Sequence, residues 1–137
     1  MASIEEALVS YLTGYSGLVA LVGTRVKPFH IPQSEELPCV TYMRIDTPRS
    51  MTHSSSGASG DLVTPRFQFD SWAIMLLDAQ SIGSVLQAAL HGKKGNIGSG
   101  SYVKKMGLIY ADGGFPMEEP ELKIWRWVGQ YIVCAEE

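Results

Sequence analysis

The chain has 137 residues, of which 45% are hydrophobic and 18% charged, and its formal net charge is −3. This length predicts a single domain over residues 1–137 with a core of its own, and the composition argues against global disorder. The acidic balance disfavours a freestanding nucleic-acid binder, no apolar run is long enough for a membrane-spanning helix, and the N-terminus shows no secretory pattern.

The first predicted element is a helix that begins at an S-x-x-E capping box formed by Ser3 and Glu6. Apolar residues then recur at helical spacing, in one stripe: Ile4, Ala7, Leu8, Tyr11 and Leu12. Gly14 is expected to end this helix in the left-handed conformation. A second apolar run over residues 18–22 predicts one or two further helical turns that end at Gly23.

The next segments read as extended chain. Residues 25–32 contain Pro28 and Pro32 and therefore suit the edge of a sheet. Residues 39–47 are rich in β-branched and aromatic residues and predict a strand. Residues 48–61 are mostly polar, with five serines, and are expected to form a mobile hairpin tip.

A second strand is predicted over residues 66–75, where large apolar residues alternate with polar ones. The simplest topology pairs it antiparallel with residues 39–47 and leaves residues 48–61 as the long loop of that hairpin. A loop of this length is uncommon in compact domains and is usually functional or disordered.

Asp78 is the expected N-cap of a second long helix that ends at Gly92, with its stripe at Ile82, Val85, Leu86, Ala89 and Leu90. Residues 92–100 then form a hairpin-like connection, residues 102–110 a strand, and Asp112-Gly113-Gly114 a turn. Residues 122–134 form the strongest strand signal. The prediction is an α+β fold: a mainly antiparallel sheet with the two long helices packed on one face.

The sequence contains no recognisable catalytic or metal-binding motif. His30, His53 and His91 do not stand in a recognisable arrangement with a nucleophile and an orienting group. No set of residues has metal-ligand spacing, so we expect neither a metal nor a cofactor. Cys39 and Cys134 lie in apolar stretches and predict reduced, buried thiols of a cytosolic protein.

Two features leave alternatives open. Trp125, Trp127 and Tyr131 share one face of the last strand. They predict either a central strand buried on both sides or an aromatic face that meets another subunit. The pairs Lys93-Lys94 and Lys104-Lys105 flank one loop and are either solvated surface or a positive patch for an acidic partner.

The layout resembles the tail-completion proteins (tail terminator or neck proteins) of long-tailed bacteriophages and prophages, over nearly the whole chain. The resemblance rests on the order and spacing of short motifs. These are the N-terminal helix, the lead-in Leu37-Pro38-Cys39-Val40, the Ser/Gly-rich tip, the strand Arg66-Phe67-Gln68-Phe69-Asp70-Ser71-Trp72-Ala73, the helix from Asp78-Ala79 to Ala89-Leu90, and the terminal aromatic strand.

The resemblance implies a structural virion protein without enzymatic activity, assembled in the host cytoplasm. Its copies would form a ring, six-fold in symmetry, at the head-proximal end of the tail, where it terminates the tail tube and joins it to the head connector. Its partners would be itself, the tail-tube protein and the connector, with DNA only passing through the lumen and no membrane contact. We expect these residues at subunit or partner interfaces: Met51, His53, Arg66, Trp72, Trp125, Trp127 and Tyr131.

Two other classes compete with this hypothesis. A small ligand-binding or regulatory α+β module would need an apolar pocket with a few convergent polar groups. A small hydrolase would have to use His53 or His30, although a flexible loop does not hold catalytic geometry well.

Overall fold

The computed structural model describes residues 3–29, 31, 37–50, 62–98, 100–121 and 123–136. The helical elements are α1 (Ile4–Thr13), α2 (Ser16–Val22), α3 (Leu76–Leu90) and the short 3-10 helix η1 (Gly100–Tyr102). The strands are β1 (Val26–Pro28), β2 (Cys39–Asp46), β3 (Arg49–Ser50), β4 (Leu62–Val63), β5 (Arg66–Ala73), β6 (Gly95–Ile97), β7 (Lys104–Glu119) and β8 (Ile124–Glu136). The α+β class is confirmed.

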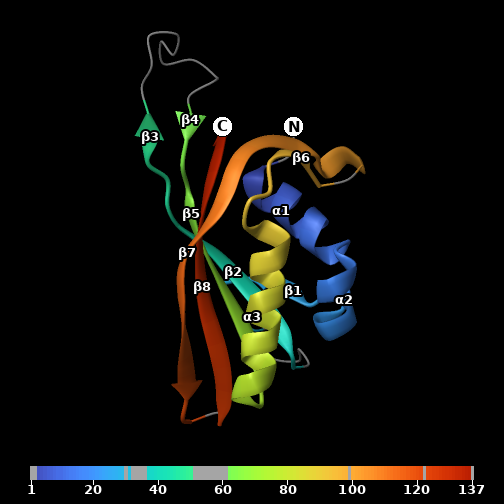
Figure 1. The fold of residues 1–137 in the computed structure, drawn as a ribbon, viewed down its shortest axis with the longest axis vertical. Coiled ribbons are helices and arrows are strands. Elements are labelled where there is room, and N and C mark those ends of the chain that lie inside the picture. Colours follow the sequence, from blue (N-terminus) through green and yellow to red (C-terminus); the bar gives the residue numbers. More distant parts are fainter. Residues whose placement is uncertain are drawn as a thin grey trace.

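The strands form one sheet in which β8 is central. It pairs with β5 and β4 along one edge and with β7 along the other, always antiparallel. The predicted pairing of β2 with β5 is confirmed, with Thr41 opposite Asp70. The sheet is mixed, because β1 runs parallel to β2 at the edge. Figure 1 shows α1, α2 and α3 together on one side of this sheet.

The capping box that begins α1 is confirmed: Glu6 N–H donates to Ser3 Oγ and Ser3 N–H donates to Glu6 Oε1. Two details of the predicted helix ends are wrong. Gly14 ends α1 with φ −102°, not in the left-handed conformation. Asp78 is not the N-cap of α3, which begins earlier with Met75 in that position and places Asp78 in the first turn. A carboxylate there still interacts favourably with the helix dipole.

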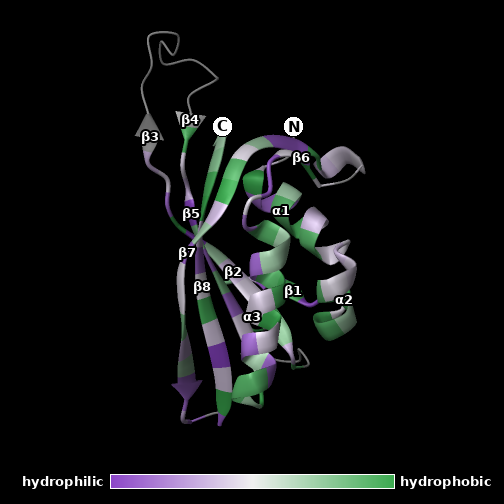
Figure 2. Cartoon of the chain, in the orientation of Figure 1, coloured by the Kyte–Doolittle hydropathy of each residue, from purple (hydrophilic) through white to green (hydrophobic). Residues whose placement is uncertain are grey.

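The core lies between the helical stripes and the facing side of the sheet. Its buried helix residues include Ile4, Leu8, Leu12, Ile82, Leu86 and Leu90, and its sheet residues include Phe67, Phe69, Ile109, Tyr131 and Val133. The predicted stripes are thus the faces that fold inward. In Figure 2, hydrophobic and hydrophilic segments alternate along α3, as expected for a helix with one buried face.

The predicted turn at Asp112-Gly113-Gly114 is wrong, because β7 continues through it. The register against β8 shifts between Ala111 and Gly114, which marks a β-bulge, and Gly113 takes φ +123°. Glycine adopts this positive φ at little cost because it has no Cβ, and it thereby accommodates the bulge. The segment before β7 is a hairpin connection as predicted, since β6 pairs antiparallel with β7.

Between β2 and β5 the chain forms a second, smaller antiparallel ladder. β3 pairs with β4, Arg49 opposite Val63 and Ser50 opposite Leu62. Residues 51–61, most of the predicted mobile tip, lie outside the described residues.

Candidate assembly surfaces

The predicted interface residues divide between the two faces of the sheet. Met51 and His53 lie outside the described residues. Arg66 and Trp72 in β5 share the face that points away from the helices. Trp125, Trp127 and Tyr131 in β8 share the face toward the helices; Tyr131, for instance, stands opposite buried Phe67. The seven residues therefore do not form one surface.

The aromatic residues of β8 pack within the chain. Tyr131 is 4% exposed and meets Phe69 edge to face, with ring centroids 5.7 Å apart. Its burial raises the pKa of the Tyr131 hydroxyl to about 12. Trp127 is half-buried between Gly83 of α3 and Gly114 of β7. Of the two alternatives for this cluster, the geometry favours internal packing for Trp127 and Tyr131.

Two glycines make room for the indole of Trp127. A Cβ added at Gly83 would lie 2.8 Å from the indole Cγ, and one added at Gly114 would lie 2.9 Å from Nε1. Real Cβ atoms do not approach other atoms this closely, so the ring fills space that any larger residue would occupy.

The face away from the helices carries a polar network around Trp72. The indole Nε1 donates to Thr41 Oγ1 at 2.8 Å, and the Arg126 guanidinium stacks 5.1 Å above the ring. Arg126 also donates to Asp70 Oδ2 at 3.2 Å and lies 3.1 Å from Glu119 Oε1. The network thus ties β2, β5, β7 and β8 together.

Asp70 is the buried member of this network, 5% exposed. Burial raises the pKa of its carboxyl above the usual range, and the nearby Arg126 charge and a hydrogen bond from Gln68 partly oppose that rise. Neither Asp70 nor Arg126 is among the interface residues predicted from the sequence. A signal was available for Arg126, which is the only charged residue between Ile124 and Cys134, whereas Asp70 occupies a polar position of an alternating strand.

Arg66 is held at the β7 bulge by an ion pair with Asp112 and by Gln130 Oε1 at 3.4 Å. Exposed apolar side chains of β7 lie along the same face of the sheet: Tyr110, Phe115 and Met117. Arg66 and Trp72, together with these β7 residues, form what we call the open-face surface. Because it joins apolar rings to charged groups, it has the composition of a protein interface.

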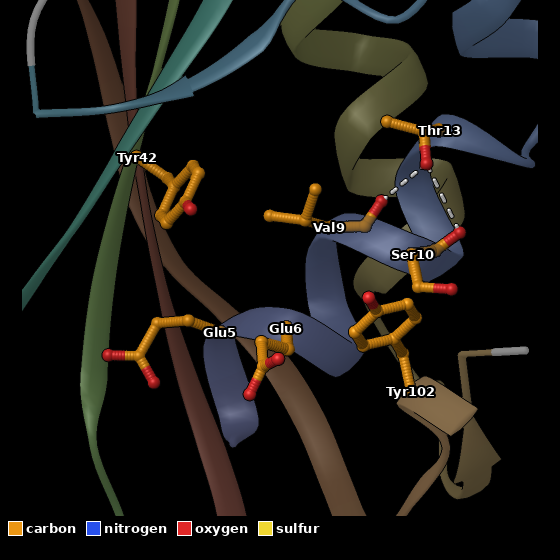
Figure 3. A pocket seen from close by; sticks show the side chains of 7 residues that line it. All are labelled: Glu5, Glu6, Val9, Ser10, Thr13, Tyr42 and Tyr102. Atoms are coloured by element: carbon orange, nitrogen blue, oxygen red, sulfur yellow. Dashed lines mark hydrogen bonds between the residues drawn. The ribbon is translucent and has the colours of Figure 1, made fainter. Parts of the chain in front are cut away.

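A groove of about 410 Å³ runs beside α1 and is lined by Glu5, Glu6, Val9, Ser10, Thr13, Tyr42 and Tyr102. Figure 3 shows Tyr42 and Tyr102 flanking the helix from opposite sides. Some of its polar groups have local partners: Glu5 pairs with Arg44 at 2.6 Å, and Thr13 Oγ1 donates to Val9 O at 2.8 Å. These two side chains therefore serve the local structure.

The remaining candidates for chemistry have ordinary roles. His91 Nδ1 accepts a hydrogen bond from Ala111 N–H at 2.9 Å and so supports the strand beside the bulge. Both cysteines are free thiols; Cys39 is buried as predicted, whereas Cys134 is only half-buried. His30 and His53 lie outside the described residues. Within the described ranges, no group of three His, Cys, Asp or Glu side chains could hold a metal ion, and no helix is long and apolar enough to cross a membrane.

One family model matches most of the chain. The family model for tail completion protein gp17 matches residues 6–127 of the chain. Among solved structures, a chain of the virion of a native gene transfer agent particle is similar to it. The TM-score is 0.76 at 15% sequence identity, with 96% of this chain and 94% of that chain covered. No curated protein matches.

Proposed function

This chain belongs to the tail completion protein gp17 family of structural phage tail proteins, and on that premise we propose that it forms a ring at the head-proximal end of the tail. The ring terminates the tail tube and joins it to the head connector. Its partners are further copies of itself, in six-fold symmetry, the tail-tube protein and the connector. It is assembled in the host cytoplasm and remains in the virion.

The observation that carries this proposal is the family match over residues 6–127, nearly the whole chain. The similarity to a gene transfer agent chain supports the fold alone. The family match and the hydrophobic core both extend from α1 to β8, as expected of a single domain. A ring of identical subunits repeats such a unit.

The surfaces of the chain are compatible with assembly. Thirteen large apolar side chains are exposed among the described residues, several of them along β7. Beyond Ala111, the edge of β7 that faces away from β8 pairs with no other strand among the described residues and offers its backbone groups for pairing. Such surfaces need cover in a mature particle. The net charge of −3 suits a ring through which DNA slides, because basic walls would retain phosphates.

The open-face surface is our candidate for contact with a partner, together with the hairpin tip that contains Met51 and His53. Trp125 at the start of β8 remains a further candidate, since it is only half-buried. The competing ligand-binding hypothesis gains no support from the groove beside α1, where Glu5 and Thr13 are engaged locally.

Tube termination is the direct test of this function. The protein is added to the tail-tube protein while tubes grow, and tube lengths are measured by electron microscopy. We expect growth to stop and the capped ends, unlike bare ends, to bind connectors. Unchanged tube lengths and equal connector binding to bare and capped tubes would refute the proposal. The matched control adds the same protein after heat unfolding.

A further inference from the structure

Two surface patches of opposite charge lie at opposite ends of the folded molecule. The first, the acidic end patch, consists of Ile74, Met75, Leu77, Asp78, Glu118 and Glu121. The second, the basic end patch, consists of Lys94, Tyr102, Val103, Lys104 and Lys105. β7 begins in the basic patch at Lys104 and ends beside the acidic one at Glu119. In Figure 1 these two ends of β7 lie at the top and bottom of the molecule.

The acidic end patch contains some of the most exposed apolar side chains in the described residues. Ile74 is 67% exposed, Met75 59% and Leu77 68%. They stand together where β5 passes into α3, and Ala73 before them pairs with Trp125, which in turn pairs with Glu118. Three large apolar side chains this exposed in one short segment are typical of an interaction site.

Exposed carboxylates lie in the segments that adjoin these apolar side chains. Asp78 lies in the first turn of α3, Glu118 at the end of β7 and Glu121 in the turn that follows. In the part of the chain that the structure describes, none of the three forms an ion pair. Lys123 is the exposed cation in the same turn, so the patch keeps an excess of negative charge.

The basic end patch is built by the β6–β7 ladder. Asn96 pairs with Lys105 and Ile97 with Lys104, which brings the start of β7 beside the segment that carries Lys94. Tyr102 is 50% exposed and Val103 38%. Lys94, Lys104 and Lys105 form no ion pair with any side chain that the structure describes, although Glu136 follows Ala135, the partner of Met106, on the neighbouring strand β8. The nearby Glu6 is engaged with Ser3 in the capping box.

The two patches are thus complementary: both carry exposed apolar side chains, and the carboxylates of one are opposite in charge to the lysines of the other. Figure 2 shows hydrophilic ribbon at both ends of β7 and hydrophobic ribbon at the start of α3. A symmetric contact between two acidic patches, or between two basic ones, would place like charges together and is disfavoured. Only a head-to-tail contact satisfies both, and head-to-tail contacts build a ring when the rotation between neighbours closes.

We propose that the acidic end patch of one copy docks on the basic end patch of the next copy. This inference rests on the proposed ring and names the two surfaces that join its subunits. Burial of Ile74, Met75 and Leu77 supplies non-directional attraction, and the opposite charges set the orientation and exclude the symmetric dimer. The contact weakens as salt concentration rises, because its charges are exposed.

Charge reversal tests this contact. Glu118→Lys with Glu121→Lys makes both ends basic, and Lys104→Glu with Lys105→Glu makes both ends acidic. Each double variant alone should need a protein concentration higher by about tenfold or more for half-assembly, measured by sedimentation velocity. An equimolar mixture should assemble at close to the wild-type concentration, because the two variants then alternate. Ser84→Lys with Gln87→Lys, which adds charge on the exposed side of α3, should change nothing.

The outcomes separate this inference from the proposed function. If both reversed variants assemble as well as the wild type, or if their folded mixture stays monomeric, the patches do not join and the inference is wrong, while the ring stands. If reversed variants form rings but fail to stop tube growth, the acidic or basic patch binds another protein, and the inference is again wrong. If the wild type itself stays monomeric, the proposed ring fails.

The apolar part of the contact has its own test. Leu77→Ser removes an exposed side chain from the acidic end patch, and Leu21→Ser removes one that is 39% exposed on α2, outside both patches. We expect Leu77→Ser to raise the half-assembly concentration several-fold and Leu21→Ser to leave it unchanged, with unchanged thermal unfolding of both. Equal effects of the two substitutions would contradict the contact.

Discussion

The indole of Trp127 in β8 lies against the backbone of Gly83 in α3, so close that a Cβ at Gly83 would come within 2.8 Å of Cγ and 3.0 Å of Nε1. This contact joins the central strand to the longest helix. It explains why an aromatic residue on this strand packs inward: a glycine in the facing helix leaves the space for its ring.

Gly83→Ala should therefore destabilise the protein, although alanine is ordinarily preferred to glycine in a helix by about 1 kcal/mol. We expect a net loss of roughly 1–3 kcal/mol in the free energy of unfolding, because the indole has to move. Urea unfolding measures it. Ser84→Ala at the next, exposed position is the control, with an expected effect of at most about 0.5 kcal/mol. A neutral or stabilising Gly83→Ala would show that the Trp127 indole can move aside without loss of packing.

Arg126→Met should be strongly destabilising at neutral pH. The substitution leaves Asp70 buried beside Trp72 without its cation, and loss of one member of a buried pair costs roughly 3–5 kcal/mol. Since the Arg126 side chain is 22% exposed, we expect the lower end of that range. Urea unfolding of Arg126→Met, of Asp70→Asn and of the double variant measures the coupling. If the double variant recovers none of the loss, Asp70 is not the cause.

The stability of the protein should carry an acid-range pH dependence that comes from Asp70. Its pKa in the folded state is raised above the ordinary 3.8, chiefly by burial, so the folded state favours the protonated form. The stability that this group contributes is therefore full below pH 3.8 and is lost as pH rises through the folded-state pKa. The unfolding free energy of the wild type minus that of Asp70→Asn should therefore fall from acid to neutral pH. A rise of this signed difference with pH would refute the account.

Shortening the hairpin tip should spare the fold and impair assembly. Replacing residues 51–60 by one glycine leaves Gly-Asp61 between Ser50 and Leu62, which are already paired across β3 and β4. Such a dipeptide suits a two-residue hairpin turn. We expect unchanged thermal unfolding and reduced ring formation or tube binding. A variant that unfolds would show that the tip is structural.

Local signals predicted much of the fold correctly. The capping box of Ser3 and Glu6, the helical stripes and the pairing of β2 with β5 depend on residues close in sequence or on strict alternation, and all three are confirmed. Tertiary pairing decided the rest. Asp112-Gly113-Gly114 is a turn signal by composition, but the long β8 offers partners on both sides of it, and the chain forms a bulge instead.

The surfaces were harder to predict, because alternation shows which residues share a face but not which face is covered. Trp127 and Trp72 are both tryptophans on long strands, yet one packs under α3 and the other lies with Arg126 on the opposite face. The lysine pairs 93–94 and 104–105 were recognised as a possible patch. Their position relative to the acidic end of β7 follows only from the β6–β7 and β7–β8 ladders.

Self-assembly into a closed ring is the property on which the proposed function depends, and the mass of the protein in solution reports it without further assumptions. Light scattering coupled to size-exclusion chromatography, over a range of concentrations and with tail tubes added, gives the number of copies. We predict a discrete, concentration-dependent species of six copies that appears as a ring in negative-stain micrographs. A species that stays monomeric at every concentration, with or without tubes, would contradict the account.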